Sequence, residues 1–307
     1  MKKILIATEK PFAKVAVDGI KEIVEKGGYE CVLLEKYTDK AQLLKAVADV
    51  NAIIFRSDII DAEVIDAAKN LEIAVRAGAG YDNIDLAAST KNNVVVMNTP
   101  GQNSNAVAEL AIGMMIYMSR NYYSGAAGTE LKGKSIGIHA YGYVGKMVAH
   151  IAQGLGMKVF AFDPFVAKEK IEADGVVVVN SVEELYEKCQ YVSLHIPAND
   201  KTKNSINFNL LNKMPKGATL INTARKEVID EEGIMKMFAE RPDFRYISDV
   251  APGNKSDIEA SYEGRYFFTP KKCGAQTQEA NVNAGLAAAN QIVKFFQQGD
   301  KTFMVNK

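Results

Sequence analysis

Short apolar runs rich in Val, Ile and Leu alternate along the whole chain with longer segments whose apolar positions recur at helical spacing. The short runs have the length and the residue types of buried strands. Repeated alternation of strand and helix is typical of βαβ units, in which parallel strands form a sheet and helices cover both faces. The sequence therefore predicts an α/β fold with parallel sheets. The expected strands are Lys3–Ala7, Glu30–Leu34, Ala52–Phe55, Glu72–Arg76, Val94–Met97, Lys134–Ala140, Lys158–Asp163, Gly175–Val179, Tyr191–Ile196, Ala218–Ala224 and Phe244–Val250.

The composition narrows the classes of partner. At 307 residues, 48% of them hydrophobic, the chain is long enough for about two domains with a core each. Its 37 basic and 37 acidic residues balance, so no overall field attracts nucleic acid or an anionic membrane. We therefore expect a small-molecule substrate, with neither nucleic acid nor membrane as a partner.

The cysteines and the N-terminal residues indicate the compartment. Cys31, Cys189 and Cys273 are far apart and lack a CxxC or histidine partner, which argues against a disulfide framework or a metal site. The first apolar run ends at Glu9, too early for a secretory signal, and no segment approaches the length of a membrane span. We expect a soluble cytoplasmic protein without a bound metal.

The stretch Ser135–Gly145, SIGIHAYGYVG, lies between a strand pattern and a helix pattern, as the turn of a dinucleotide site does. Gly142 and Gly145 occupy two glycine positions of GxGxxG, and Ala140 replaces the first, which we treat as a mild departure. The next strand ends at Asp163, whose carboxylate would accept from ribose hydroxyls and repel a 2′-phosphate. This arrangement favours NAD over NADP.

Two cationic positions follow later strand patterns. Arg225 comes directly after the strand in LINTARKEV, and its alternative role is a salt bridge at a helix end. Lys271 and Lys272 stand in the stretch TPKKCGAQTQEA, either as a solvated pair or with one of them as a catalytic group. Because open parallel sheets bind ligands at the carboxyl ends of their strands, both positions are candidates for chemistry.

An ordered set of motifs covers nearly the whole chain: VRAGAGYDNIDL, NTPGQNSNAVAEL, GIHAYGYVG, SLHIP, NTARKEVIDEEG, SDVAP and GAQTQEA. In this order they resemble the D-isomer-specific 2-hydroxy-acid dehydrogenases, in particular the short-form branch that acts on D-3-phosphoglycerate. The resemblance implies a homodimer with two Rossmann-like domains and an active site in the interdomain cleft. Residues 1–98, completed by 285–307, would form the substrate-binding domain, and residues 99–284 the NAD-binding domain.

The resemblance also assigns the reacting groups. Arg225 matches the arginine that holds the substrate carboxylate. Anchoring on GAQT places Lys272 where the family has its catalytic histidine, whereas anchoring on Thr269 and Pro270 would select Lys271. Asn254 falls where the family has the carboxylate that supports that histidine.

The two departures are chemically consistent with each other. A free lysine has a pKa of about 10.4, and a carboxylate beside it would make it still more basic. The asparagine at position 254, the nearby Arg225 and closure of the cleft would all favour the neutral amine of Lys272. As general acid/base, Lys272 predicts an alkaline optimum for the oxidation reaction.

The remaining site residues are also implied by the resemblance, as contacts of the substrate or of NAD. For Arg56 and Arg76 a surface ion pair is an equally good explanation, and for Asn103 a helix cap is the alternative. We expect His139 to pack in the core, and Met114, Met115 and Met118 to be core or dimer contacts. The implied substrate contacts are Arg56, Ser57, Arg76, Ala77, Gly78 and Asn103. The implied NAD contacts are Ala140, Tyr141, Gly142, Tyr143, Val144, Gly145, Asp163, Pro164, His195, Pro197, Thr202, Thr223, Ala224, Arg225, Asp249 and Gly274.

Three functions are compatible with the sequence. The first is NAD-dependent oxidation of D-3-phosphoglycerate to 3-phosphohydroxypyruvate, which begins the phosphorylated route to L-serine. The second is a reductase of the same family that acts on glyoxylate, hydroxypyruvate or another 2-keto acid. The third is a non-catalytic NAD-sensing protein, which the missing histidine and carboxylate favour and the arginine and lysine oppose.

Overall fold

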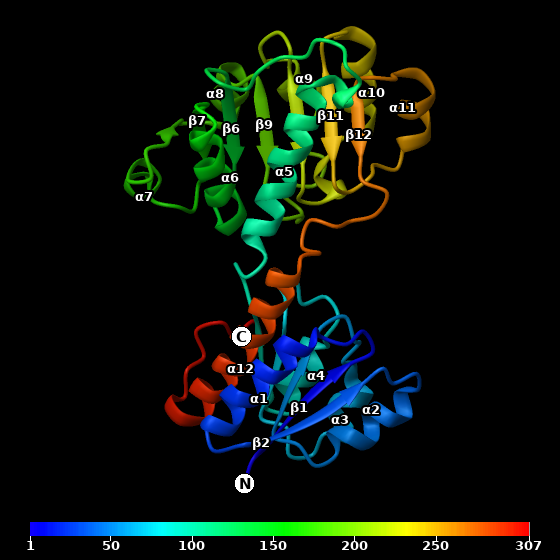
Figure 1. Cartoon of the computed structure of the whole chain (residues 1–307), viewed down its shortest axis with the longest axis vertical. Coiled ribbons are helices and arrows are strands. Elements are labelled where there is room, and N and C mark those ends of the chain that lie inside the picture. The colour runs from blue at the N-terminus through cyan, green and yellow to red at the C-terminus, as the bar shows by residue number, and fades with distance from the viewer. Residues whose placement is uncertain (307) are drawn as a thin grey trace. The chain divides into compact units, whose positions relative to one another are not determined.

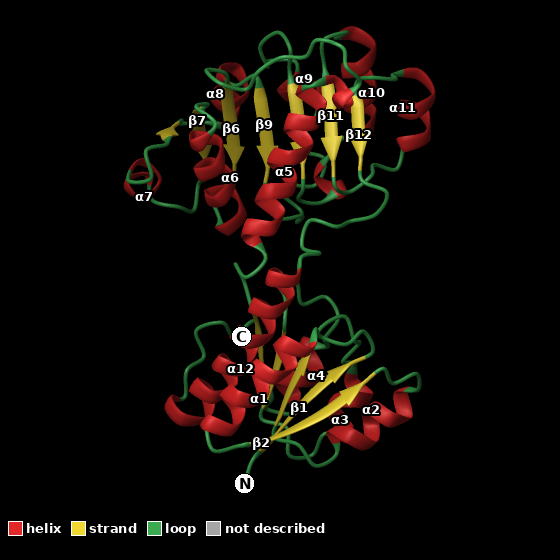
Figure 2. Ribbon diagram, in the orientation of Figure 1, coloured by secondary structure: helices red, strands yellow, loops and turns green. Residues whose placement is uncertain are grey.

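The computed structural model describes residues 1–306, which form two compact units (Figure 1). Unit 1 contains residues 1–103 together with the residues from 275 onwards, and unit 2 contains residues 104–274. Each unit has one parallel sheet with helices on both of its faces (Figure 2). The predicted α/β fold with parallel sheets is confirmed.

The sheet of unit 1 has the strand order β2-β1-β3-β4-β5. Side chains alternate along its strands: Ile4 and Ile6 pack under α1 and α12, whereas Leu5 and Ala7 pack on the opposite face. Burial on both faces explains why these strands are apolar without alternation. The strands are β1 (Lys3–Thr8), β2 (Glu30–Glu35), β3 (Ala52–Phe55), β4 (Ile73–Arg76) and β5 (Val95–Asn98), and the helices are α1 (Lys14–Lys26), α2 (Lys40–Val47), α3 (Ala62–Ala67), α4 (Leu86–Lys91) and α12 (Gln278–Gln298).

The sheet of unit 2 has the order β12-β11-β10-β9-β6-β7-β8. From β6 the chain first adds strands on one side, β7 and β8, and then crosses to add β9 to β12 on the other side, so the strand order reverses between β6 and β9. Such a reversal is where open α/β sheets place their ligands. The strands are β6 (Ser135–His139), β7 (Lys158–Phe162), β8 (Val177–Val178), β9 (Tyr191–Leu194), β10 (Thr219–Asn222), β11 (Arg245–Ser248) and β12 (Tyr266–Phe268). The helices are α5 (Ser104–Ser119), α6 (Tyr143–Gly154), α7 (Lys168–Glu172), α8 (Val182–Lys188), α9 (Phe208–Leu211), α10 (Glu231–Glu240) and α11 (Lys255–Ser261), with short 3-10 helices at Asn121–Tyr123 and Lys226–Val228.

The expected strands all form, and the structure adds β12, which the sequence analysis missed. Its three aromatic residues are fewer than a typical strand run, and pairing with β11 recruits them. The unit boundaries also differ from the predicted ones. A break after residue 284 would cut through α12, which is one continuous helix capped by Thr277 and packed against α1, so the structure moves this break to residue 274.

Met114, Met115 and Met118 are buried in unit 2, between α5 and the sheet. They are core residues, which is the first of the two alternatives that the sequence left open. None of the helices described is long and apolar enough to cross a membrane.

Candidate functional site

The predicted dinucleotide turn joins β6 to α6 and is held by Asp163, which follows β7. One carboxylate oxygen of Asp163 accepts from the N–H of Tyr141 at 2.7 Å, and the other accepts from the N–H of Phe165 at 2.8 Å. The acid predicted to meet ribose therefore also fixes the backbone of the turn. This second role requires β6 and β7 to be neighbours, which they are.

The two glycines of the turn are needed for different reasons. A Cβ atom on Gly145 would lie 2.3 Å from the Ala140 carbonyl oxygen, so only glycine lets α6 pack this close to the turn. A Cβ on Gly142 would meet nothing within 4 Å. The space beside Gly142 lies at the N-terminus of α6, where unpaired backbone N–H groups and the helix dipole favour a phosphate.

Ala140 has a φ of 79°, in the left-handed region that an L-residue with a Cβ rarely adopts. The expectation of a mild departure was therefore wrong, because the turn requires this conformation and alanine is strained in it.

We expect Ala140→Gly to raise the free energy of unfolding by about 1 kcal/mol, because glycine adopts a positive φ without strain. Ala287→Gly, within helix α12, is the opposite control and should lower it by about 1 kcal/mol. Urea unfolding of both variants measures the two changes. A destabilised Ala140→Gly variant would contradict the assignment of strain.

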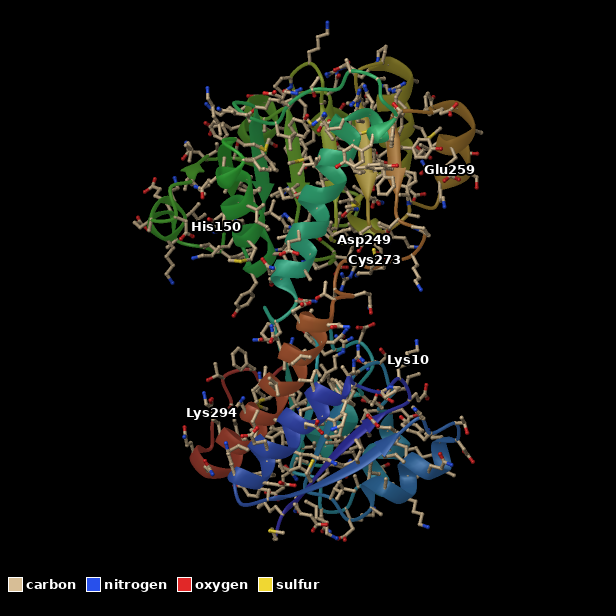
Figure 3. The ribbon with its side chains drawn as sticks, in the orientation of Figure 1. Lys10, His150, Asp249, Glu259, Cys273 and Lys294 are labelled. Carbon is tan, nitrogen blue, oxygen red and sulfur yellow. The ribbon has the colours of Figure 1, made fainter. Side chains whose placement is uncertain are left out.

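Two of the three histidines of the chain are poorly suited to proton transfer. Burial lowers the pKa of His139 to about 4 and that of His195 to about 3. His139 lies in β6 with Tyr186 Oη 3.2 Å from its Nδ1, and Nε2 of His195 is buried without a hydrogen-bond partner. His150 is exposed on α6 (Figure 3). The two histidines at the ends of β6 and β9, His139 and His195, therefore do not supply a proton carrier.

The two lysines lie in the segment Thr269–Gly274, which follows β12. Both Lys271 and Lys272 are exposed, whereas Thr269 and Gly274 at the ends of the segment are buried. The carboxyl ends of β10, β11 and β12 lie side by side in the sheet and lead to Arg225, Asp249 and this segment respectively. Three strands thus bring the predicted substrate arginine, Arg225, and the predicted base, Lys272, to one edge of the sheet.

Arg225 is exposed directly after β10, and its Nη1 donates to the Ala224 carbonyl at 3.0 Å. Within residues 1–306 it has no carboxylate partner, so the alternative of a salt bridge is not borne out. The sequence analysis missed Asn222, which is fully buried and shapes this turn by accepting from Ala224 N–H at 2.9 Å and donating to the Arg225 carbonyl at 3.0 Å. Its signal was an asparagine at the end of an apolar strand.

Asn254 replaces the family carboxylate, but another carboxylate reaches its neighbour. The side-chain amide of Asn254 donates to the Glu231 carbonyl at 3.0 Å, and the Gly253 N–H donates to the Glu231 carboxylate. Glu231 is the first residue of α10. Its carboxylate is therefore engaged with the backbone beside the position where the family has its acid.

In unit 1, Arg76 braces the loop that follows β4. Its guanidinium donates to the carbonyls of Arg56 at 3.0 Å and Gly80 at 2.9 Å. The N–H of Ala77 donates to Phe55 and that of Gly78 to Arg76, at 2.8 and 2.9 Å. Both N–H groups therefore have acceptors within unit 1 in this structure, and the substrate contacts implied for Ala77 and Gly78 stay a prediction.

Arg56 follows β3 and is half-buried, and this burial lowers the pKa of its guanidinium. It donates to the Asn281 side chain on α12 and lies over the ring of Phe12, with 5.0 Å from its Cζ to the ring centroid. Asp58, which is buried, accepts from the Arg56 backbone N–H rather than pairing with the guanidinium. Arg56 is therefore held by neutral partners in place of the surface ion pair that we considered, with exposed Ser57 beside it.

Comparison with known proteins assigns a family to this geometry. Residues 104–264 match the NAD binding domain of the D-isomer specific 2-hydroxyacid dehydrogenases. The crystal structure of the NAD+-bound 3-phosphoglycerate dehydrogenase of Entamoeba histolytica is 50% identical to this chain, with a TM-score of 0.85 over 100% of this chain and 99% of that one. The chain belongs to the D-isomer specific 2-hydroxyacid dehydrogenase family.

Two curated members show how the family varies. The D-3-phosphoglycerate dehydrogenase of Methanocaldococcus jannaschii is 32% identical over 90% of this chain and 55% of its own length. The hydroxypyruvate reductase of Thermotoga maritima is 31% identical over 86% of this chain and 91% of its own length. The chain thus spans about half the length of the curated phosphoglycerate dehydrogenases it matches.

The residues of unit 2 fit the NAD of this family. The uncovered helix end at Gly142 can take the pyrophosphate, and Asp163 can accept from the ribose. Thr223 is buried with its hydroxyl unpaired, so it can bond a ligand. By contrast, the hydroxyl of Thr202 donates to the Pro197 carbonyl at 2.6 Å and shapes its own loop.

The other predicted residues are placed as follows. Tyr141 is buried, Tyr143 and Pro164 are exposed, Val144 and Asn103 are partly buried, and Ala224 is buried. Asn103 directly precedes α5.

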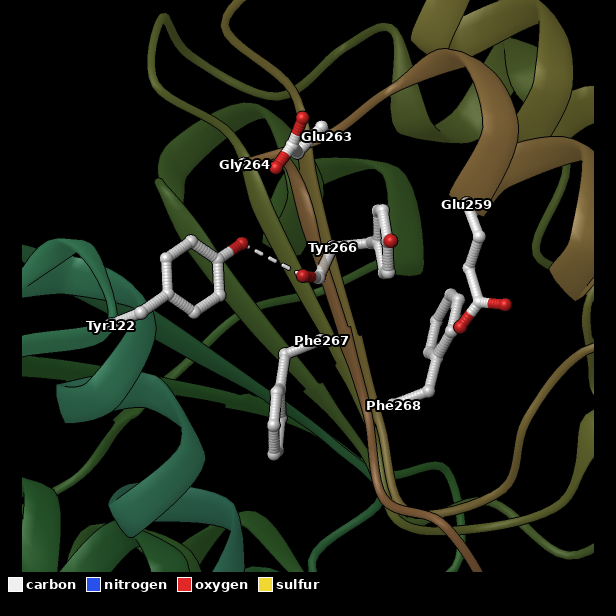
Figure 4. Close-up of a pocket in the computed structure, with 7 residues that line it drawn as sticks. All are labelled: Tyr122, Glu259, Glu263, Gly264, Tyr266, Phe267 and Phe268. Carbon is white, nitrogen blue, oxygen red and sulfur yellow. Dashed lines mark hydrogen bonds between the residues drawn. The ribbon is translucent and has the colours of Figure 1, made fainter. Parts of the chain in front are cut away.

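The pocket of Figure 4 is separate from this site. It is lined by Tyr122, Glu259, Glu263, Gly264, Tyr266, Phe267 and Phe268, around the edge strand β12, and contains none of the predicted site residues. Nor do residues 1–306 contain a group of three His, Cys, Asp or Glu side chains placed to hold a metal ion.

Proposed function

We propose that this chain oxidises the C2 hydroxyl of D-3-phosphoglycerate to give 3-phosphohydroxypyruvate, as the first step of the phosphorylated route to L-serine. One observation carries the chemistry: the neighbouring ends of β10, β11 and β12 lead to Arg225, Asp249 and the segment that bears Lys272. The names of the relatives support the substrate, since several curated members and the 50%-identical structure are phosphoglycerate dehydrogenases.

The residues of the chain divide the reaction between them. The planar guanidinium of Arg225 holds the substrate carboxylate with two parallel hydrogen bonds and polarises the C2 oxygen. Bound NAD supplies the acceptor for the hydride that leaves C2. The neutral amine of Lys272 takes the proton of the C2 hydroxyl, and in the reverse direction its ammonium returns that proton.

The cations of unit 1 support a phosphorylated substrate. Arg56 follows β3 and Arg76 is the last residue of the neighbouring strand β4, so both residues lie at the carboxyl edge of the sheet. A substrate phosphate would compensate the half-buried guanidinium of Arg56, whose hydrogen-bond and ring partners are neutral and whose charge the nearby Asp58 carboxylate offsets only in part.

Reduction of hydroxypyruvate or glyoxylate is the second candidate. The Thermotoga maritima reductase favours it, because that relative aligns over nearly all of its own length. The two functions differ in whether turnover requires the phosphate.

The test compares NADH formation from D-3-phosphoglycerate and D-glycerate, and NADH consumption with 3-phosphohydroxypyruvate, hydroxypyruvate and glyoxylate. We expect kcat/KM to be at least about 100-fold higher for D-3-phosphoglycerate than for D-glycerate, and for 3-phosphohydroxypyruvate than for hydroxypyruvate or glyoxylate. This factor is the contribution of one or two charge-assisted hydrogen bonds to the phosphate. Equal values would favour the reductase. An inactive chain that still binds NAD would favour the NAD-sensing protein.

A further inference from the structure

The segment that bears Lys272 is tied at both ends to one carboxylate. Asp249 follows β11 and is 1% exposed. Its Oδ1 accepts from the Thr269 hydroxyl and the Cys273 N–H, each at 2.9 Å, and its Oδ2 accepts from the Gly274 N–H at 2.9 Å. The Cys273 thiol lies 3.4 Å from Oδ1 (Figure 3). Asp249 therefore holds the residue where the segment begins and the two residues where it ends.

The packing around this carboxylate leaves little freedom. A Cβ atom on Gly274 would lie 2.9 Å from Oδ2, so the approach of the backbone requires glycine. The Thr269 hydroxyl also lies 3.0 Å from the Asp249 carbonyl oxygen. Because the carboxylate is buried, loss of any of these donors would leave part of its charge uncompensated.

The bonds of Asp249 constrain Lys272 through the backbone. Lys272 directly precedes Cys273, and the N–H of Cys273 belongs to the peptide group that joins the two residues. While that N–H bonds to Oδ1, the backbone of Lys272 cannot rotate away. The sequence assigned Asp249 to NAD, but in this structure three strong donors and a thiol already occupy most of the acceptor positions of its carboxylate.

We propose that Asp249 and Thr269 form a clamp that positions Lys272 for proton transfer. The clamp fixes where the lysine backbone lies, and so sets the direction from which the amine meets the C2 hydroxyl. Neither residue exchanges a proton with the substrate. The proposal rests on the proposed dehydrogenase function, and it makes Asp249 a positioning residue instead of only a cofactor contact.

The test removes one bond of the clamp and leaves the shape of the side chain unchanged. Thr269→Val lacks the hydroxyl, Thr269→Ser retains it, and Asp249→Asn is a second variant that places an amide against the Gly274 N–H. Thr302→Val is the matched control, because it removes a similar threonine bond to Asp300 in unit 1, at 2.6 Å.

Two measurements report on the clamp: hydrogen exchange of the segment, and the kinetics of oxidation. In Thr269→Val and Asp249→Asn, hydrogen exchange of the peptide that contains Cys273 and Gly274 should be at least about tenfold faster. Their kcat for oxidation should fall by about tenfold and about 100-fold respectively, with a shifted pH profile, and Thr269→Val should leave the Kd for NAD unchanged. Thr269→Ser should restore exchange and kcat, and Thr302→Val should match the wild type in both.

The clamp is wrong if Thr269→Val and Asp249→Asn both leave the exchange of that peptide unchanged. The proposal that the clamp positions Lys272 is wrong if hydrogen exchange of that peptide accelerates in the variants while their kcat and pH profile stay those of the wild type. A wild type that oxidises none of the 2-hydroxy acids would refute the proposed function and with it the role of the clamp in catalysis. The exchange rates would still show whether Asp249 and Thr269 hold the segment.

Discussion

Lys272→Ala should lower kcat for oxidation by about 10³-fold, the usual contribution of a positioned general base, with little change in the Kd for NAD. Lys271→Ala is the matched control, because it is the adjacent exposed lysine of the same segment, and it should retain kcat within about twofold. Stopped-flow measurement of NADH formation, with NAD titrated separately, distinguishes loss of chemistry from loss of binding.

The pH profile is an independent readout of the same residue. Because a free lysine has a pKa of about 10.4, the neutral amine becomes more abundant as pH rises, so oxidation by the wild type should accelerate toward alkaline pH. Lys272→Ala should lose this rise. A flat wild-type profile between about pH 6 and 10 would contradict a lysine base.

The histidine and the carboxylate that the family has at positions 272 and 254 can be restored together as a rescue experiment. Lys272→His alone lacks the carboxylate that would orient and support the imidazole, so it should be weakly active. Adding Asn254→Glu should recover at least about tenfold in kcat and move the optimum toward neutral pH. If Lys271→Ala and Lys272→Ala both turned over normally, the two lysines would be surface charges and the base would lie elsewhere.

Arg225→Ala should lower kcat/KM by about 10²- to 10⁴-fold. Two hydrogen bonds to a carboxylate contribute about 1.5–3 kcal/mol each. Arg225→Lys should remain well below the wild type, because an ammonium has the charge but not the planar fork. Steady-state kinetics with D-3-phosphoglycerate at saturating NAD measure both losses.

The neighbouring exposed Lys226 is the control for charge alone, and Lys226→Ala should leave kcat/KM within about twofold. The Arg225 interpretation would be contradicted if Arg225→Ala and Lys226→Ala lost activity equally. A stable Arg225→Ala is expected, because its guanidinium bonds only to the adjacent Ala224 carbonyl within residues 1–306.

Patterns along the chain were sufficient to predict much of the fold. The apolar runs predicted the strands because both faces of each sheet are buried, so nearly every position of a strand has an apolar side chain. The strand β12 was missed because three aromatic residues carry little signal without their partner β11. The domain boundary at 284 was misplaced because the helical pattern of α12 does not show which unit it packs against.

The candidate site divides in the same way. The motif around Ala140 identified the dinucleotide turn, because its spacing is local, but it did not reveal that Ala140 is held at a positive φ. The motif at Arg76–Gly78 implied substrate contacts, but it did not reveal that the N–H groups of Ala77 and Gly78 are paired within unit 1.

By itself, the sequence determined the α/β class, the family, the dinucleotide turn and the candidates Arg225 and Lys272, because periodicity and ordered motifs are properties of neighbouring residues. Only the tertiary structure decided what Asp249 holds. Its partners at 269, 273 and 274 are distant in sequence, and they reach one carboxylate because β11 and β12 pair side by side. Hydrogen bonding in a buried site depends on which strand ends meet, and that is settled by the packing of the sheet.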